Sequence, residues 1–217
     1  MRVLITGAKG QLGTELQKQL NEGGCSIGSV PKRFTDAKVV GIDLEEMDLT
    51  DKYAVKEYLR SGSFDVVFNC AAYTNVDGCE THREDAYRVN AMAPLFLAEA
   101  CEKTETQLVH VSTDYVFSGE EQSPRTEYDI PSPISVYGKT KYAGEQFVRD
   151  SCSRYFIVRS AWLYGSGKNF VKTILRVAKE KGKVTVVNDQ FGNPTSSVDL
   201  AYHLLKIADG APYGLYH

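Results

Sequence analysis

The sequence predicts an α/β fold with a doubly wound parallel sheet. Short apolar runs alternate with helical patterns from one end of the 217 residues to the other. The first of these runs ends in a glycine-rich turn that leads directly into a helix. Strands that are apolar throughout are typically buried on both faces, and the intervening helices provide that cover. Ligands of such folds bind at the carboxyl ends of the strands, so we expect the functional residues there.

The strands are predicted from aliphatic and β-branched runs that are bounded by polar or glycine-containing segments. The expected strands are residues 2–7, 38–43, 65–72, 107–117, 155–165 and 183–189. The chain ends in GLYH, which is typical of the beginning of another strand. Because a helical pattern separates each strand from the next, the strands are expected to run parallel.

The helices are predicted from apolar residues at helical spacing and from capping residues. They are residues 11–20, 50–62, 84–103, the stretch 132–146 that contains Tyr137, 169–182 and 196–210. In the first of them Leu12, Leu16 and Leu20 form one apolar stripe. Pro94 lies inside the third helical pattern, where it predicts a kink or a restart because proline has no backbone N–H to donate.

The composition argues against several classes of protein. The chain is 42% hydrophobic and 24% charged with a net charge of −3, and no clustered Lys/Arg stripe indicates a nucleic-acid partner. No apolar run reaches the roughly 18 residues of a membrane helix, and the N-terminus lacks a secretory cleavage site. The five cysteines and four histidines form no C-x-x-C or H-x-x-x-H pair. We therefore predict no metal site, no disulfide framework and a cytoplasmic protein.

The glycine-rich turn predicts a dinucleotide site. Gly7, Gly10 and Gly13 form G-x-x-G-x-x-G between the first strand and the first helix. Glycines at this position allow a tight turn and a close backbone approach, so that a pyrophosphate can rest on the free amides of the helix N-terminus. The context of the motif, at the first strand-to-helix turn of an alternating chain, favours a Rossmann-like domain.

The adenosine end of such a site needs an acidic residue after the second strand, and Asp43 is the candidate. Asp48 and Leu49 follow as candidate wall residues for the adenine. Lys32 and Arg33 precede the second strand and could meet a 2′-phosphate. The sequence therefore leaves the choice between NADH and NADPH open.

Tyr-x-x-x-Lys occurs three times, as Tyr137/Lys141, Tyr164/Lys168 and Tyr202/Lys206. Two glycines oppose a helix after Tyr164, and no polar strand end precedes Tyr202. Tyr137, in contrast, follows the strand that ends in Ser112, Thr113 and Asp114. A helix places residues four apart on one face, so the Lys141 ammonium is expected beside the Tyr137 phenol, where it would lower the pKa of that phenol. The pair is the candidate for proton transfer, with the Thr113 hydroxyl holding a carbonyl oxygen.

Together with Asn90 in VNAMAPLFLAEA, these features resemble the extended short-chain dehydrogenase/reductases. Four further stretches, STDYVFSG, SVYGKTKYAGE, RSAWLYG and VNDQFGNPTSS, resemble the dTDP-4-dehydrorhamnose reductases within that family. The resemblance covers essentially the whole chain. It implies reduction of the C4 ketone of dTDP-4-dehydro-L-rhamnose to dTDP-L-rhamnose by NADPH or NADH, in nucleotide-sugar and polysaccharide biosynthesis.

The resemblance also implies roles for single residues. Tyr137 would donate the proton, Lys141 would hold the nicotinamide ribose and tune Tyr137, and Thr113 would polarise the ketone. The remaining cofactor contacts would come from two strand ends, at Gly10, Gln11 and Leu12 for the pyrophosphate and at Ala71, Ala72 and Tyr73 beside the cofactor. The sugar would be contacted by Thr113, Asp114 and Trp162.

Two domains follow from the same resemblance, an NAD(P)-binding Rossmann domain at 1–165 and, at 166–217, the last sheet elements with the start of a substrate-binding lobe. Family members run on past this point, so the chain is expected to be truncated relative to them. A homodimer is left open. Two alternatives also remain: a nucleotide-sugar epimerase or dehydratase, although Tyr115 stands where dehydratases carry a Glu, and a non-catalytic NADP-binding regulatory subunit.

Overall fold

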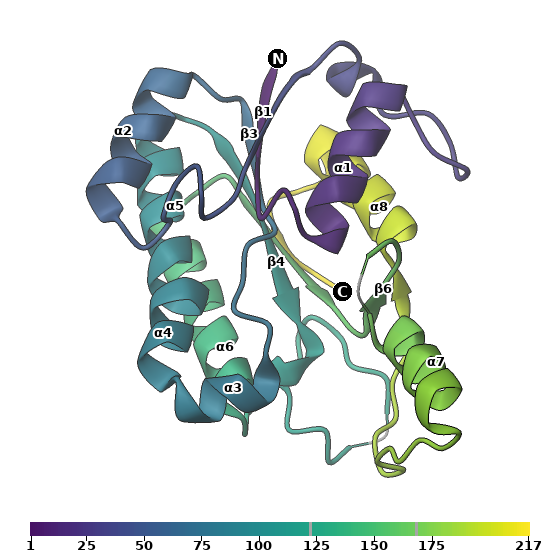
Figure 1. The fold of residues 1–217 in the computed structure, drawn as a ribbon. Helices are drawn as coiled ribbons and strands as arrows, with labels where there is room; N and C mark the ends of the chain where they lie inside the picture. Colours follow the sequence, from purple (N-terminus) through teal and green to yellow (C-terminus); the bar gives the residue numbers. More distant parts are fainter. Residues whose placement is uncertain (122, 168) are drawn as a thin grey trace.

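The computed structural model describes residues 1–121, 123–167 and 169–217. They form three layers, a parallel sheet with a layer of helices on each face (Figure 1). The six strands are arranged in the order β2-β1-β3-β4-β5-β8, and every neighbouring pair is parallel. Their bounds are β1 Arg2–Thr6, β2 Lys38–Ile42, β3 Val66–Asn69, β4 Gln107–Thr113, β5 Tyr155–Ser160 and β8 Gly214–Tyr216. A separate two-stranded pair is formed by β6 Leu163–Tyr164 and β7 Thr195–Ser196. The predicted doubly wound parallel sheet is therefore confirmed.

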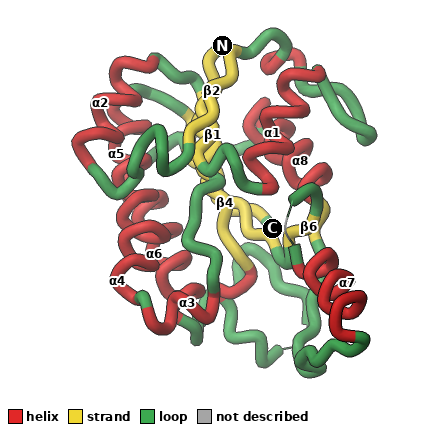
Figure 2. The backbone as a smooth tube through the Cα atoms, in the orientation of Figure 1, coloured by secondary structure: helices red, strands yellow, loops and turns green. Residues whose placement is uncertain are grey.

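Helices cover both faces of the sheet (Figures 1 and 2). One face carries α1 Gln11–Glu22 and α8 Ser197–Gly210, and the other carries α2 Lys52–Gly62, α5 Ala93–Lys103 and α6 Val136–Ser151. The shorter helices are α3 Val76–Thr81 and α4 Arg83–Tyr87, the π-turn Arg88–Met92, and the 3₁₀ turns Lys32–Phe34 and Asp114–Val116. Helix α7 Phe170–Lys181 lies near the two-stranded pair in Figure 1, and none of its described residues is buried.

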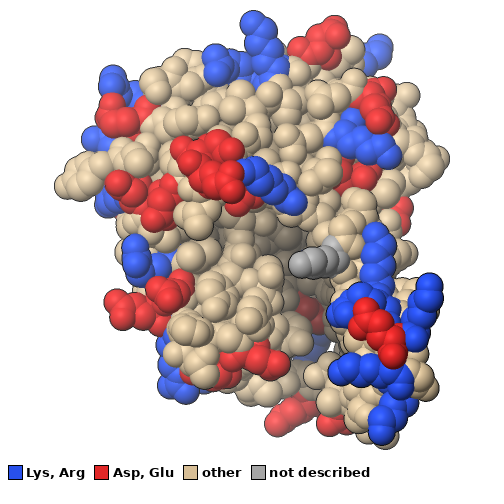
Figure 3. Space-filling model, in the orientation of Figure 1, with Lys and Arg blue, Asp and Glu red and all other residues tan. Residues whose placement is uncertain are grey.

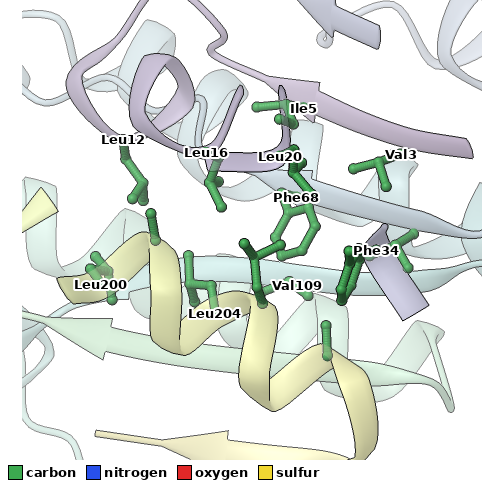
Figure 4. Packing of buried hydrophobic residues seen from close by; sticks show 14 of the residues in the cluster. Val3, Ile5, Leu12, Leu16, Leu20, Phe34, Phe68, Val109, Leu200 and Leu204 are labelled. Atoms are coloured by element: carbon green, nitrogen blue, oxygen red, sulfur yellow. The ribbon is translucent and has the colours of Figure 1, made fainter. Parts of the chain in front are cut away.

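Two apolar clusters hold these layers together, one on each face of the sheet. On the first face the predicted stripe of Leu12, Leu16 and Leu20 points at Leu200 and Leu204 of α8 (Figure 4). Side chains of the sheet complete this cluster, and the same view labels Val3, Ile5, Phe68 and Val109 among them. The expected spacing of apolar residues in the first helix therefore corresponds to a buried helix–helix–sheet contact.

The predicted interruption at Pro94 is confirmed. The helical stretch changes to a π-turn at Arg88–Met92, and α5 begins at Ala93 with the proline in its first turn. Pro94 has no N–H to donate to the Asn90 carbonyl four residues earlier, so the regular ladder cannot continue through this point. The first helical turn is where a missing N–H costs least.

The predicted strand at residues 183–189 is wrong, because the segment forms a loop. Val186 and Val187 are 52% and 65% exposed, although their side chains favour strands. The position beside β5 is occupied by β8 at the GLYH stretch, so the predicted sixth strand is not the neighbour of the fifth. The prediction of a strand at GLYH is confirmed by β8, whereas the additional strand predicted at 183–189 does not form. Strands β3, β4 and β5 also end earlier than expected, at Asn69, Thr113 and Ser160.

No helix in the described part of the chain is both long and apolar enough to cross a membrane. Helix α8 and strand β8 pack into the same core and sheet as the N-terminal elements. The division into two domains at residue 165 stays a prediction.

We predict that Leu204→Ala lowers the free energy of unfolding by about 2–5 kcal/mol, because it opens a cavity in the α1–α8 contact where Leu204 is fully buried. Leu175→Ala is the matched control, since Leu175 lies in helix α7 with 65% of its surface exposed. Urea unfolding of both variants measures the difference. Equal losses in the two variants would contradict the core as described.

Candidate active site

A cleft of about 720 Å³ opens at the carboxyl ends of β1, β3 and β4 and is visible as a hollow in Figure 3. The candidate catalytic, cofactor and sugar residues line it, whereas Lys32 and Arg33 do not. The candidates that line it are Gly7, Gly10, Gln11, Leu12, Gly13, Asp43, Asp48, Leu49, Ala71, Ala72, Tyr73, Thr113, Asp114, Tyr137, Lys141 and Trp162. Parallel neighbours end at the same edge of a sheet, and this brings segments more than 100 residues apart in sequence into one site.

The glycine loop forms one end of the cleft. Gly7 has a φ of +63°, and a Cβ at this position would come within 2.8 Å of the Ala71 backbone nitrogen. Glycine is therefore required here for both conformation and space. The loop turns through a hydrogen bond from the Gly10 nitrogen to the Gly7 carbonyl, 3.0 Å long, and α1 begins at Gln11 with a glycine as its N-cap.

The N-terminus of α1 points into the cleft without a side chain to cap it. Such a terminus is an anion-binding position, because its first amides and the helix dipole both favour negative charge. Beside it, the buried Gln11 Oε1 has no hydrogen-bond partner among the described residues, and as an acceptor it would need a donor group of the ligand, such as a hydroxyl, and not a phosphate oxygen. The helix terminus thus fits a phosphate-bearing group.

At the adenosine end, backbone N–H groups of the glycine-rich loop and of the next residue orient the Asp43 carboxylate. The carboxylate accepts the Lys9 N–H at 3.1 Å and the Leu44 N–H at 2.9 Å. The Lys9 ammonium bridges Glu45 at 2.6 Å and Glu46 at 3.3 Å on the surface. Two carboxylates, Asp43 and Asp48, therefore line this end of the cleft among apolar side chains.

The suggestion that Lys32 and Arg33 could meet a 2′-phosphate is wrong. Arg33 donates to the Ala208 carbonyl at 2.6 Å, at the end of α8, and neither residue lines the cleft among the described residues. The adjacent Phe34 is buried against the α1–α8 cluster, and this anchors the whole turn on that face. Asp48 remains beside the cleft, where hydrogen bonds from Thr50 lower the pKa of its carboxyl.

Tyr137 is the second residue of α6, and Ser135 caps that helix by accepting the Gly138 N–H at 3.0 Å. The Tyr115 ring stands edge-on to the Tyr137 ring, with centroids 5.4 Å apart. Burial raises the pKa of the Tyr137 phenol to about 12, against a smaller lowering by the Thr113 hydroxyl. The phenol is consequently protonated at neutral pH.

Lys141 lies one turn further along α6 and is almost completely buried. Its ammonium donates to the Val111 carbonyl at 2.7 Å, and burial lowers its pKa to about 8. The expectation that Lys141 lowers the pKa of the Tyr137 phenol is therefore wrong for this structure. Desolvation dominates both groups, since it disfavours the phenolate and the ammonium alike.

The substrate end of the cleft is built on the end of β4 and the turn after β5. The Thr113 hydroxyl donates to Asp114 at 3.0 Å and accepts the Tyr115 N–H at 3.2 Å. Burial raises the pKa of the Asp114 carboxyl. Trp162 has a φ of +48°, unusual for a bulky residue, and is 44% exposed at the mouth of the cleft. Strain of this kind clusters at ligand-binding positions.

The two rival tyrosine pairs lie elsewhere. Lys206 stacks over the Tyr202 ring on the surface of α8, with 5.6 Å between the ammonium and the ring centroid. Tyr164 is in β6, and Lys168 lies outside the described residues.

Sequence reasoning did not place Asn90 in the site, although it is buried and anchors the loop after β3. Its side chain accepts the Tyr73 N–H at 2.8 Å and donates to the Tyr73 carbonyl at 3.1 Å. It also donates to the Thr140 hydroxyl of α6 at 3.2 Å. A buried Asn within an apolar helical pattern was the available signal, because such a group needs hydrogen-bond partners.

Comparison with known proteins gives a consistent result. Residues 1–217 match the family described as RmlD substrate binding domain. The chain is 42% identical to a dTDP-4-dehydrorhamnose reductase of Mycobacterium tuberculosis, over 98% of this chain and 67% of that protein.

Solved structures agree with this match. A dTDP-4-dehydrorhamnose reductase from Clostridium acetobutylicum has a TM-score of 0.92 at 44% identity, covering 100% of this chain and 74% of that one. A second, from Bacillus anthracis and solved in complex with NADP, has a TM-score of 0.90 at 40% identity, with coverages of 100% and 73%.

We predict that Gly138→Ala lowers the free energy of unfolding by about 1–3 kcal/mol, because a Cβ at Gly138 would overlap the Tyr115 carbonyl oxygen. Gly210→Ala is the matched control at the end of α8, where no described atom lies within 4 Å of the added carbon. The control should be neutral or slightly stabilising, since alanine favours helices. Urea unfolding distinguishes the two, and equal stabilities would show that α6 does not approach Tyr115 this closely.

Proposed function

The chain belongs to the RmlD substrate binding domain family, and we propose that it is an NAD(P)H-dependent reductase of dTDP-4-dehydro-L-rhamnose. The reaction converts the C4 ketone of that nucleotide sugar into the C4 hydroxyl of dTDP-L-rhamnose. The observation that carries the proposal is the single cleft that joins the α1 N-terminus to Thr113, Tyr137 and Lys141. The dTDP-4-dehydrorhamnose reductases at 40–44% identity support the same substrate and reaction.

The residues present fit a nicotinamide dinucleotide. Gly10, Gln11 and Leu12 would line the pyrophosphate, with the amides of the first turn of α1 directed at it, and Asp43 would accept hydrogen bonds from the adenosine ribose. Asp48 and Leu49 would flank the adenine, and Ala71, Ala72 and Tyr73 would flank the cofactor at the end of β3. When bound, the cofactor supplies the hydride that reduces C4.

Tyr137 supplies the proton. A phenol with a pKa near 12 is protonated at neutral pH, which is the form that a general acid needs to donate to the developing alkoxide. Lys141, one helical turn further along α6, would hold the nicotinamide ribose with its ammonium. The Thr113 hydroxyl can turn from Asp114 to the ketone oxygen and polarise it.

The sugar would lie between the end of β4 and Trp162. Asp114 offers a partly buried carboxyl for sugar hydroxyls, and the half-exposed indole of Trp162 offers an apolar face. The five cysteines are free thiols, which favours a reducing compartment, and we place the enzyme in the cytoplasm. A homodimer is compatible with this assignment. Oxidation of NADPH or NADH on addition of dTDP-4-dehydro-L-rhamnose tests the activity directly, and no oxidation with either cofactor would refute it.

We predict that Tyr137→Phe lowers kcat by about 100- to 10,000-fold, because it removes the acidic proton and keeps the ring. The Kd of the cofactor should change by only a few-fold. Tyr202→Phe is the matched control, a helical tyrosine that also precedes a lysine by four residues, and it should retain wild-type kcat. Steady-state kinetics and fluorescence titration measure both quantities. Retention of more than about a tenth of kcat in Tyr137→Phe would exclude general acid catalysis by this residue.

We predict that both cofactors are used and that Asp43 sets the ratio of their affinities. Asp43→Asn keeps an acceptor oxygen for the ribose but removes the charge that repels a 2′-phosphate. The Kd of NADPH should therefore fall about tenfold relative to the Kd of NADH. Asp209→Asn at the far end of α8 should leave the ratio unchanged. Fluorescence titration with each cofactor is the measurement, and an unchanged ratio in Asp43→Asn would place the ribose elsewhere.

A further inference from the structure

A buried ion pair lies directly beneath the catalytic helix. The side chains of Glu145 in α6 and Arg159 in β5 are 0% and 2% exposed, and the Arg159 Nη2 is 2.6 Å from Glu145 Oε2. The Arg159 Nε donates to the other carboxylate oxygen at 2.9 Å, which makes the pair bidentate. The Ser112 hydroxyl of β4 donates to the same oxygen at 2.5 Å. The carboxylate thus links one helix to two strands.

This cluster adjoins the active-site residues along the chain on both of its main elements. Ser112 immediately precedes Thr113, and Glu145 follows Lys141 by one helical turn. Residues four apart on a helix lie on the same face, so Glu145 and Lys141 both face the sheet. Removing one partner of a buried pair leaves an uncompensated charge, so the geometry around it is strongly constrained.

Four titratable groups surround the Lys141 ammonium on the elements packed against it. They are Cys70 at the end of β3, His110 in β4, and Tyr137 and Glu145 in α6. Three of them are neutral near pH 7: burial raises the pKa of Cys70 and of Tyr137 to about 12 and lowers that of His110. The remaining group, Glu145, forms the ion pair with Arg159, and its Coulomb interaction raises the pKa of Lys141 against the larger lowering by burial.

We propose that Glu145 is a positioning residue, whose buried ion pair with Arg159 anchors α6 to β5 and whose charge keeps the Lys141 ammonium protonated at the floor of the cleft. The inference rests on the proposed function, because it concerns the lysine that holds the cofactor. Arg159 sets the strength of the effect, since its positive charge neutralises part of the field that the carboxylate exerts on Lys141.

Removing the charge of Glu145 and removing the charge of Arg159 should have opposite effects on the pH at which Lys141 loses its proton. The lowered pKa of Lys141 means that its charge is present at low pH and is lost as the pH rises through about 8. Glu145→Gln removes the anion and should move the alkaline limb of cofactor binding and of kcat/KM to lower pH by about one unit. Arg159→Met exposes Lys141 to the unpaired carboxylate and should move the same limb to higher pH.

The experiment measures the Kd of NADH by fluorescence, and kcat/KM, between pH 6 and about 10 in wild type and in both variants. Glu102→Gln is the structural control. Glu102 holds Ser153 through a 2.7 Å hydrogen bond at the far end of α6, and its loss should leave the limb in place. Glu145→Asp keeps the charge and should bring the limb back toward wild type.

A Glu145→Gln variant that loses affinity equally at every pH, with its limb unmoved, would make the pair a structural anchor alone and overturn the proposal. If either single variant fails to fold, the double variant Glu145→Gln with Arg159→Met removes both charges, which buried pairs tolerate better. Its limb should also lie below that of the wild type, and a wild-type limb would again overturn the proposal. Because cofactor binding is read without the sugar, the result stands even if the enzyme acts on a different substrate.

Discussion

Helix α6 crosses the end of β4 at backbone contact distance, and the arrangement of the active site depends on that contact. The absence of a side chain at Gly138 lets the helix approach the Tyr115 carbonyl, and Gly144 does the same beside the Asn90 carbonyl. With the two backbones this close, the Lys141 ammonium reaches the Val111 carbonyl at 2.7 Å. A larger residue at Gly138 would push α6 away from the turn after β4, and one at Gly144 would push it away from the π-turn that contains Asn90.

A second contact of α6, with Asn90, connects the cofactor end of the cleft with the catalytic end. Pro94 interrupts the helical ladder before α5, and the chain passes through a π-turn that contains Asn90. The Asn90 side chain then binds the backbone of Tyr73 after β3 and the Thr140 hydroxyl in α6. One buried amide therefore fixes the distance between the loop that would flank the cofactor and the helix that would supply the proton. π-turns inside helices are often found at functional sites for this reason.

Burial sets the chemistry of the two central groups in opposite directions. It raises the pKa of the Tyr137 phenol and lowers that of the Lys141 ammonium, because each charged form loses its hydration. The first effect keeps an acid protonated until a base develops on the substrate. The second leaves the pKa of the lysine at about 8 even with an anion nearby, because the Glu145 carboxylate offsets only part of the effect of burial. The ion pair of Glu145 with Arg159 places that anion one helical turn from the lysine.

The sequence by itself determined the local features of this protein: the parallel α/β architecture, the glycine loop at the first strand-to-helix turn, the restart at Pro94 and the preference for Tyr137 among three tyrosine pairs. All of these follow from periodicity, backbone chemistry or residue spacing within about ten positions. The tertiary structure decided what depends on neighbours distant in sequence. It assigned the last sheet edge to β8 and left residues 183–189 in a loop, since a strand needs a partner that its own residues do not specify. It directed Arg33 to α8 and away from the cleft, and it reversed the expected direction of the Tyr137 pKa. It also brought Glu145 together with Arg159 and Ser112. Polar groups in the packed interior have lost their water and must pair with other protein groups, and those partners can come from distant parts of the chain.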